Sequence, residues 1–321
     1  MPYSFAADET AEEAFRRCAR EQLETATNEL TVEIDNDPVR AVHNARKAVK
    51  KERALLRLSR GSLPAKQRKR ENKILRDAAR TLSDARDADV LIQALDQLSS
   101  HFSGQLPDTT FREVRKPLVR ARAAERRRLR RNSINGEATE GLKSVWSEID
   151  SWKLKGDGWK SIEPGLMWSY RTGRDSFRKA QRDPTDENLH AWRKRVKDLW
   201  YQLRLLSDVG GPVVKGQAKE AHKLADLLGD DHDLGVLRES IVNMDDVVAD
   251  VEGVLALLDH RRGQLQSEAF NLGQRLYAEK PGAFRRRMRR SWDAGRTRAR
   301  DASEQQQPVE VARRTRRPVT A

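Results

Sequence analysis

The chain has 321 residues, with 63 lysines and arginines against 49 acidic residues, a net charge of +14 and a pI near 10.0. This positive charge favours phosphate-rich partners, namely nucleic acid, inorganic polyphosphate or an anionic membrane surface. The single cysteine, Cys18, excludes an intramolecular disulfide and fits a reducing compartment. The acidic N-terminus does not resemble a signal peptide, and no apolar run approaches the ~18 residues that a membrane span needs. We therefore expect a cytoplasmic protein.

Helical spacing of apolar residues extends along the chain, without the alternation typical of strands. The expected helices cover residues 9–33, 43–58, 64–82, 87–99, 108–131, 138–150, 165–181, 190–205, 214–228, 233–247, 249–279 and 281–300. Breaks are expected where Gly and Pro gather, as at Gly61–Pro64 and Gly210–Pro212. The polar and basic tail from about residue 302 is expected to be disordered. The sequence therefore predicts an all-α fold.

Two of these helices, 43–58 and 190–205, align without gaps and are identical at eight positions. Residues spaced i, i+3, i+4, i+7, i+11 and i+14 share one helix face. In the first helix that face carries His43, Arg46, Lys47, Lys50, Ala54 and Arg57, which we call the first stripe. In the second it carries His190, Arg193, Lys194, Lys197, Tyr201 and Arg204, which we call the second stripe. Two cationic stripes predict a duplicated site for an extended polyanion, and a solvated basic face is the alternative.

The opposite face of each helix is apolar, as a helix that packs on a core requires. It contains Leu189, Trp192, Val196, Leu199, Leu203 and Leu206 in the second copy, and Val42, Ala45, Val49 and Leu56 in the first. Glu52 interrupts the apolar face of the first copy, the helix at residues 43–58. Trp192 and Trp200 lie on or beside the core stripe, so we interpret them as packing residues and not as platforms for bases.

The repeat extends beyond one helix, because residues 82–91 match residues 228–237 at nearly the same offset. We therefore expect two halves, 5–152 and 166–300, a joint at 153–165 and a tail at 301–321. Two similar four-helix bundles related by a pseudo-twofold axis are the expected architecture.

A second duplicated array lies on the helices that follow the stripes. It comprises Lys69, Lys73 and Arg76 in the first half and Lys215, Lys219 and His222 in the second, 146 residues later. If these helices neighbour the stripes, the stripes and the array could together line the walls of one channel. An ordinary exposed helix face explains the array equally well.

The run Asp230, Asp231, His232 and Asp233 suggests a metal-dependent phosphohydrolase, which would need further histidine ligands. The chain has only six histidines, and the first half has Ala85, Arg86 and Asp87 in place of residues 231–233. We therefore interpret Asp84 and Asp230 as helix caps, and Asp87 and Asp233 as partners of nearby cations. His43 and His190 are interpreted as phosphate ligands and not as catalytic groups.

The two motifs resemble those of the CHAD family, the conserved-histidine α-helical domain. That family repeats a pattern close to H-x-x-R-x-x-x-(K/R)-(K/R)-x-R, followed by a helix with L-x-x-x-R-D-x-x-V-L. The first half matches at His43, Arg46, Lys50, Lys51 and Arg53, and then at Leu82, Arg86, Asp87, Val90 and Leu91. The second half matches at His190, Arg193 and Lys197, and then at Leu228, Asp233, Val236 and Leu237; it departs at Asp198, Trp200 and His232.

The resemblance covers about residues 5–295 and implies two four-helix bundles that bind inorganic polyphosphate in a basic channel. The acidic strand motif of the CYTH domain, often fused to this family, is absent, which argues against phosphohydrolase activity. We therefore expect a non-enzymatic polyphosphate-binding protein without a cofactor or metal, cytoplasmic and associated with polyphosphate granules. The alternatives are a sequence-neutral nucleic-acid binder, which the arginine runs 126–131 and 285–287 would serve, and a metal-dependent phosphohydrolase. Oligomeric state, preferred chain length and the strength of the second stripe stay open.

Overall fold

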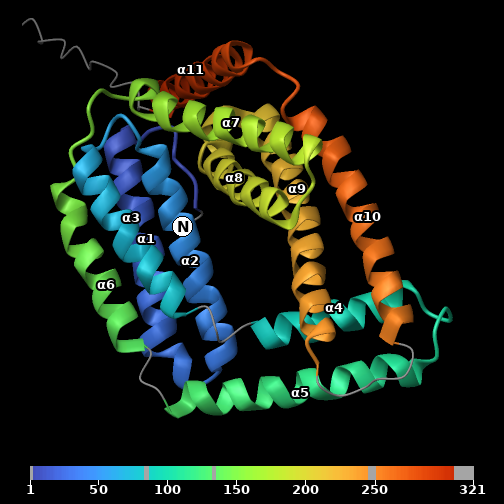
Figure 1. Ribbon diagram of the computed structural model, residues 1–321. Coiled ribbons are helices and arrows are strands. Elements are labelled where there is room, and N and C mark those ends of the chain that lie inside the picture. Colours follow the sequence, from blue (N-terminus) through green and yellow to red (C-terminus); the bar gives the residue numbers. More distant parts are fainter. Residues whose placement is uncertain (1–2, 83–86, 132–134, 245–250, 307–321) are drawn as a thin grey trace, which may run out of the picture.

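The computed structural model describes residues 3–82, 87–131, 135–244 and 251–306. In these ranges the chain forms eleven α-helices and no strand, which confirms the all-α fold (Figure 1). The helices are α1 (Ala11–Thr31), α2 (Pro38–Leu58), α3 (Ala65–Thr81), α4 (Asp87–His101), α5 (Asp108–Arg131), α6 (Asn135–Glu148), α7 (Trp159–Arg182), α8 (Asp186–Leu205), α9 (Ser207–Val242), α10 (Val251–Leu276) and α11 (Pro281–Gln306). None of the described helices is both long and apolar enough to cross a membrane.

Local signals set the beginnings of the helices that matter most for the site. Asp37 caps α2 by accepting a hydrogen bond from the Arg40 amide at 3.1 Å, and Pro38 occupies the first helical position, where its missing N–H costs nothing. Thr185 caps α8 through the Asn188 amide at 3.3 Å. Both repeated helices therefore begin several residues before the expected starts at residues 43 and 190.

Two groups of four helices pack around a continuous apolar core. The first group consists of α1, α2, α3 and α6, and the second of α7, α8, α11 and the N-terminal part of α9. Helix α2 packs on both α7 and α8, so it joins the groups. Phe15, Leu55 and Trp192 are fully buried in this shared core. The helices that carry the two stripes thus lie at the centre of the molecule.

A third group has its own apolar cluster and draws its helices from both halves of the sequence. Helices α4 and α5 pack with α10 and the C-terminal part of α9 at one end of the molecule (Figure 1). Its buried side chains include Leu95, Val114, Leu237 and Leu258. Helix α9 reaches from the second group into the third, and its partly buried Leu227 packs against both apolar clusters. Helix α10 also contributes buried side chains to both clusters, such as Leu272 and Leu258.

The order of elements repeats along the chain. Helices α2 and α8 begin 148 residues apart, and α6 and α11 begin 146 residues apart. Helix α9 occupies the place that α3 and α4 share in the first half. The pseudo-twofold relation and the domain boundaries stay predictions.

Three expectations about helix ends were wrong. The predicted break between residues 228 and 233 does not exist, because α9 continues from Ser207 to Val242 with a kink at Gly211, where φ is +71°. Helix α7 begins at Trp159, six residues before its expected start at residue 165, and contains Pro164. Helix α11 continues to Gln306, six residues beyond its expected end. The expectation for residues 307–321 lies outside the described residues.

Candidate polyanion-binding site

The two stripe-bearing helices pack antiparallel through their C-terminal halves. Arg57 on α2 forms an ion pair with Asp198 on α8 at 3.1 Å, and Lys51 lies within electrostatic reach of Arg204. Between these two pairs, Gln202 Nε2 donates a hydrogen bond to the Ala54 carbonyl at 3.3 Å. The C-terminal ends of the stripes therefore meet, while His43 and His190 lie at opposite ends.

The first stripe is partly buried along most of its length. His43, Arg46, Lys50 and Arg57 are half-buried, and Lys47 is exposed. The apolar residues on the opposite face are buried, as expected. Glu52, which interrupts them, is also fully buried.

Lys51 and Arg53, beside the first stripe, show how crowded the positive charge is. Burial, Arg204 and Lys47 together lower the pKa of Lys51 to about 8. Burial and Arg57 lower the pKa of Arg53 to about 10, and its Nε donates to Asn72 on α3 at 3.2 Å. An anion bound here would relieve this repulsion.

The second stripe is interrupted near its middle. His190, Arg193, Lys197 and Arg204 are half-buried and Lys194 is exposed, but Tyr201 is buried and stacks on Trp200 at 4.4 Å. Asp198 is buried beside the stripe, and burial raises its pKa even though Arg57 and Arg195 pair with it. Asp198 thus places a carboxyl group beside the second stripe at the crossing of the two helices.

The histidine of the second stripe has an aromatic partner that the sequence did not predict. The rings of His190 and His232 lie 4.5 Å apart, on α8 and α9. Burial lowers the pKa of both to about 4, aided by His232 at His190 and by Arg193 at His232. At neutral pH both rings are therefore neutral, and they offer N–H donors without charge.

The acidic run on α9 does not form the predicted cap. Asp230 lies inside α9, so its interpretation as a helix cap was wrong. Buried Asp231 accepts hydrogen bonds from Arg262 Nε at 3.0 Å and Gln266 Nε2 at 2.9 Å. Among the described residues, no three His, Cys, Asp or Glu side chains gather as metal ligands. Asp84, Arg86 and the side chain of Asp87 lie outside the described residues.

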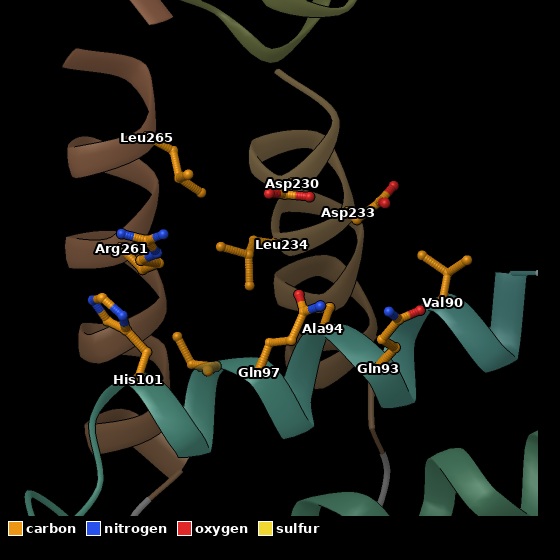
Figure 2. A pocket seen from close by; sticks show the side chains of 11 residues that line it. Val90, Gln93, Ala94, Gln97, His101, Asp230, Asp233, Leu234, Arg261 and Leu265 are labelled. Atoms are coloured by element: carbon orange, nitrogen blue, oxygen red, sulfur yellow. The ribbon is translucent and has the colours of Figure 1, made fainter. Parts of the chain in front are cut away.

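A cavity of about 450 Å³ lies between α4, α9 and α10. Asp230 and Asp233 of α9, Arg261 of α10 and His101 of α4 all line it (Figure 2). Burial, then Asp233, raises the pKa of Asp230, while the nearby charges of Arg261 and Arg193 oppose the shift. Because the cavity carries acidic groups of its own, it does not extend the cationic array.

The second duplicated array lies on helices that pack beside the stripes. Lys69, Lys73 and Arg76 are exposed on α3, which packs on α2. Lys215, Lys219 and His222 are exposed on α9, which packs on α8. Some of these residues already have partners, because Lys215 pairs with Asp208 at 3.1 Å and His222 stacks on Trp200 at 4.0 Å. Each array thus lies on a helix that packs against the stripe-bearing helix of its own half.

Three arginines and a tryptophan that were not predicted from the sequence lie where α2, α3, α7 and α8 meet. The guanidinium carbons of Arg60 and Arg195 lie 4.1 Å and 5.2 Å from the ring centre of Trp168 on α7. Arg68 on α3 lies beside Arg57 and Arg60, whose charges lower its pKa after burial. The one available signal was the position of Arg60, three residues after Arg57. Arg68 and Arg195 belong to other helices, so spacing could not reveal them.

Comparison with known proteins gives a family match and a similar solved structure. The family model of the CHAD domain matches residues 14–242. No curated protein matches the chain. Among solved structures, PptA from Streptomyces chartreusis superposes with a TM-score of 0.58 at 14% sequence identity, over 84% of this chain and 100% of that chain. This structural likeness concerns the fold. Since the family model spans well over half of the sequence, the chain belongs to the CHAD domain family.

Proposed function

We propose that this protein binds inorganic polyphosphate along the two stripes, in a basic channel, and does not hydrolyse it. The observation that carries the proposal is the antiparallel contact of α2 and α8, which brings cations of both halves together at Lys51 and Arg204. Membership of a family associated with polyphosphate binding supports it. The arrays on α3 and α9 would add further cations to the walls of this channel.

The physical chemistry of the ligand fits this arrangement. Polyphosphate is a flexible chain with about one charge per unit and without bases, so it needs a row of cations and no shape readout. With a rise of about 1.5 Å per residue, each stripe is about 21 Å long and faces several consecutive phosphates. Arginine supplies forked donors and lysine a mobile charge. Affinity should build with the number of contacts and fall steeply with salt.

The test compares long-chain polyphosphate with duplex DNA of equal total phosphate at near-physiological salt. We expect polyphosphate to bind more tightly. Reversing Arg193 and Lys197 to Glu should weaken it by more than tenfold. The control reverses Arg178 and Arg182, an exposed pair with the same spacing on α7, and should have a much smaller effect. Equal or tighter binding of DNA would favour the nucleic-acid alternative.

Catalysis has a separate test. We expect no phosphate release from polyphosphate or nucleoside triphosphates with Mg²⁺ or Mn²⁺. Release that Asp233→Ala abolishes, but that the stripe reversals leave intact, would favour the phosphohydrolase. The cytoplasmic location and the association with granules stay predictions of the sequence.

A further inference from the structure

The three missed arginines and Arg57 form a second concentration of positive charge, which we call the arginine cluster. Arg57 comes from α2, Arg60 from the turn that follows it, Arg68 from α3 and Arg195 from α8. Trp168 stands between two of them, because the guanidinium groups of Arg60 and Arg195 both lie within cation–π distance of its ring. Four segments of the chain thus direct arginines to one place.

The charge of the arginine cluster is not balanced by the described acidic side chains. Asp198 pairs with Arg57 at 3.1 Å and with Arg195 at 3.2 Å. Arg60 and Arg68 form no ion pair with any described carboxylate, and the buried Nε of each has no hydrogen-bond partner there. Arg68 is only 8% exposed. A buried N–H without a hydrogen-bond partner is costly, and an anion beside these two arginines would offer acceptors for both Nε groups.

The helix ends explain part of the cluster but not all of it. The negative end of the α2 dipole favours Arg57 and Arg60 near Leu58. Arg68, in contrast, stands in the first turn of α3, where the dipole disfavours a cation. That helix begins without a side-chain cap and without an acidic residue in its first turn. An anion would satisfy both the N-terminus of α3 and Arg68.

The backbone around the cluster is tightly held. A Cβ at Gly165 of α7 would lie 1.9 Å from the Leu58 carbonyl oxygen, so α7 touches the end of α2 directly. Gly61, with φ of +89°, turns the chain against Pro164. The arginines therefore project from fixed positions, which lowers the cost of ordering them around a ligand.

We propose that the arginine cluster binds one dianionic phosphate group, either free or as the end of a polyphosphate chain. Guanidinium groups match phosphate oxygens with pairs of parallel donors, and several around one site favour a group with two charges over a chain unit with one. The chain-end form rests on the function proposed above, and the free-anion form does not.

The test uses the full chain with linear tripolyphosphate, which has two ends, and cyclic trimetaphosphate, which has none. Calorimetry should show at least tenfold weaker binding of the linear ligand by Arg60→Gln and by Arg68→Gln. The control is Arg80→Gln, which removes a charge from an exposed position of α3, the helix that carries Arg68. This change should alter the affinity for tripolyphosphate less than twofold. If inorganic phosphate competes with tripolyphosphate, the ligand of the cluster is a free anion. If it does not compete, the ligand is the end of a polyphosphate chain. Equal effects of all three variants, or equally tight binding of the cyclic compound, would overturn the proposal.

Thermal unfolding gives a second measurement that does not depend on the affinity. Arg68→Met removes the charge and keeps the volume, so without ligand it should unfold at the same or a higher temperature than the parent. Tripolyphosphate should raise the unfolding temperature of the parent by clearly more than that of this variant. A lower unfolding temperature without ligand would show that Arg68 has a structural partner, and would contradict the proposal.

The arginine cluster and the stripes can fail independently. Reversing Arg46 and Lys50 to Glu should weaken the binding of long polyphosphate far more than that of tripolyphosphate. Loss of long-chain binding alone, with tripolyphosphate retained, separates the two sites. Insensitivity of the wild-type protein to long polyphosphate would overturn the proposed function while the cluster could still bind free phosphate.

Discussion

The carboxyl group of Glu52 lies among apolar side chains of the first helix group. Neither of its oxygens has a hydrogen-bond partner among the described residues, and burial, then Glu71, raises its pKa to about 8. The folded protein therefore holds a proton that the unfolded chain releases near pH 4.3. The contribution of protonated Glu52 to the free energy of unfolding is therefore fully present below about pH 4.3, and it is lost as the pH rises through about 8.

Glu52→Gln should remove this dependence, because the amide keeps the size and carries no charge. At pH 9 the variant should exceed the parent in free energy of unfolding by roughly 2 to 4 kcal/mol, and at pH 4 the two should be nearly equal. Urea unfolding at pH 4, 7 and 9 measures the difference. The exposed Glu24→Gln serves as control. Parallel pH curves for Glu52→Gln and the parent would rule out this explanation.

His190 and His232 should produce the opposite trend at lower pH. Because the pKa of both is lowered to about 4, the unfolded chain takes up protons near pH 6.5 and the folded chain does not. Stability is therefore lost as the pH falls from about 6.5 to 4. In His232→Gln we expect a flatter loss and a higher pKa for His190, observed by NMR titration. His260→Gln, at an exposed position of α10, should leave the slope unchanged; an equal change there would refute the assignment.

At the scale of helices, two glycines allow backbones to touch. A Cβ at Gly295 of α11 would lie 1.8 Å from the Val209 carbonyl oxygen, as the one at Gly165 would from Leu58. Neither neighbour is a flexible side-chain end that could move away. These contacts fix α11 beside the kink of α9 and α7 beside the end of α2.

Gly165→Ala should therefore lower the free energy of unfolding by about 3 kcal/mol or more, through overpacking. The matched control is Gly263→Ala in α10, where a Cβ meets nothing within 4 Å. That change should stabilise the protein by about 0.5–1 kcal/mol, as removal of a helix-interior glycine usually does. Denaturant unfolding measures the free energy of unfolding of both variants. A Gly165→Ala protein as stable as the parent would mean that α7 can shift away from α2.

Most helices could be predicted from the sequence because their apolar spacing is regular, and α3 ended within one residue of expectation. The predicted break in α9 was wrong for a physical reason. Gly229 followed by Asp230 and Asp231 resembles a helix end, yet buried Leu228, Asp231 and Leu234 keep the helical spacing. Gly229 also faces the Arg193 side chain, 3.5 Å from a Cβ placed there. The stripes were visible as spacing within one helix, whereas the arginine cluster depends on tertiary packing.

For the whole molecule, the antiparallel crossing of α2 and α8 brings the C-terminal ends of the two stripes together. A polyphosphate that touches both stripes makes its second contact intramolecularly, at an effective concentration that can reach ~mM. Long chains should therefore gain far more from the duplication than short ones. Each stripe alone would behave as an ordinary basic surface.

Reversal of Arg46 and Lys50 to Glu should weaken long chains far more than chains too short to reach both stripes. Reversal of Arg193 and Lys197 should do the same to a smaller extent, since Asp198 and Tyr201 already interrupt that stripe. Combined, the four changes should cost less than the sum, because bridging is lost after the first pair. Titration with short and long polyphosphate measures this, with helicity checked by circular dichroism. Equal, additive losses for both lengths would contradict a shared ligand chain.

The third helix group has a consequence for how the protein is made. Val114 and Leu118 of α5 belong to the same buried apolar cluster as Leu234 and Leu258, which the ribosome adds more than 100 residues later. At about 5–20 residues per second, the apolar face of α5 waits on the order of ten seconds for its partners. The first helix group can fold meanwhile from α1, α2, α3 and α6. During translation α4 and α5 are therefore an exposed apolar arm, and this arm is where chaperones would bind the nascent chain.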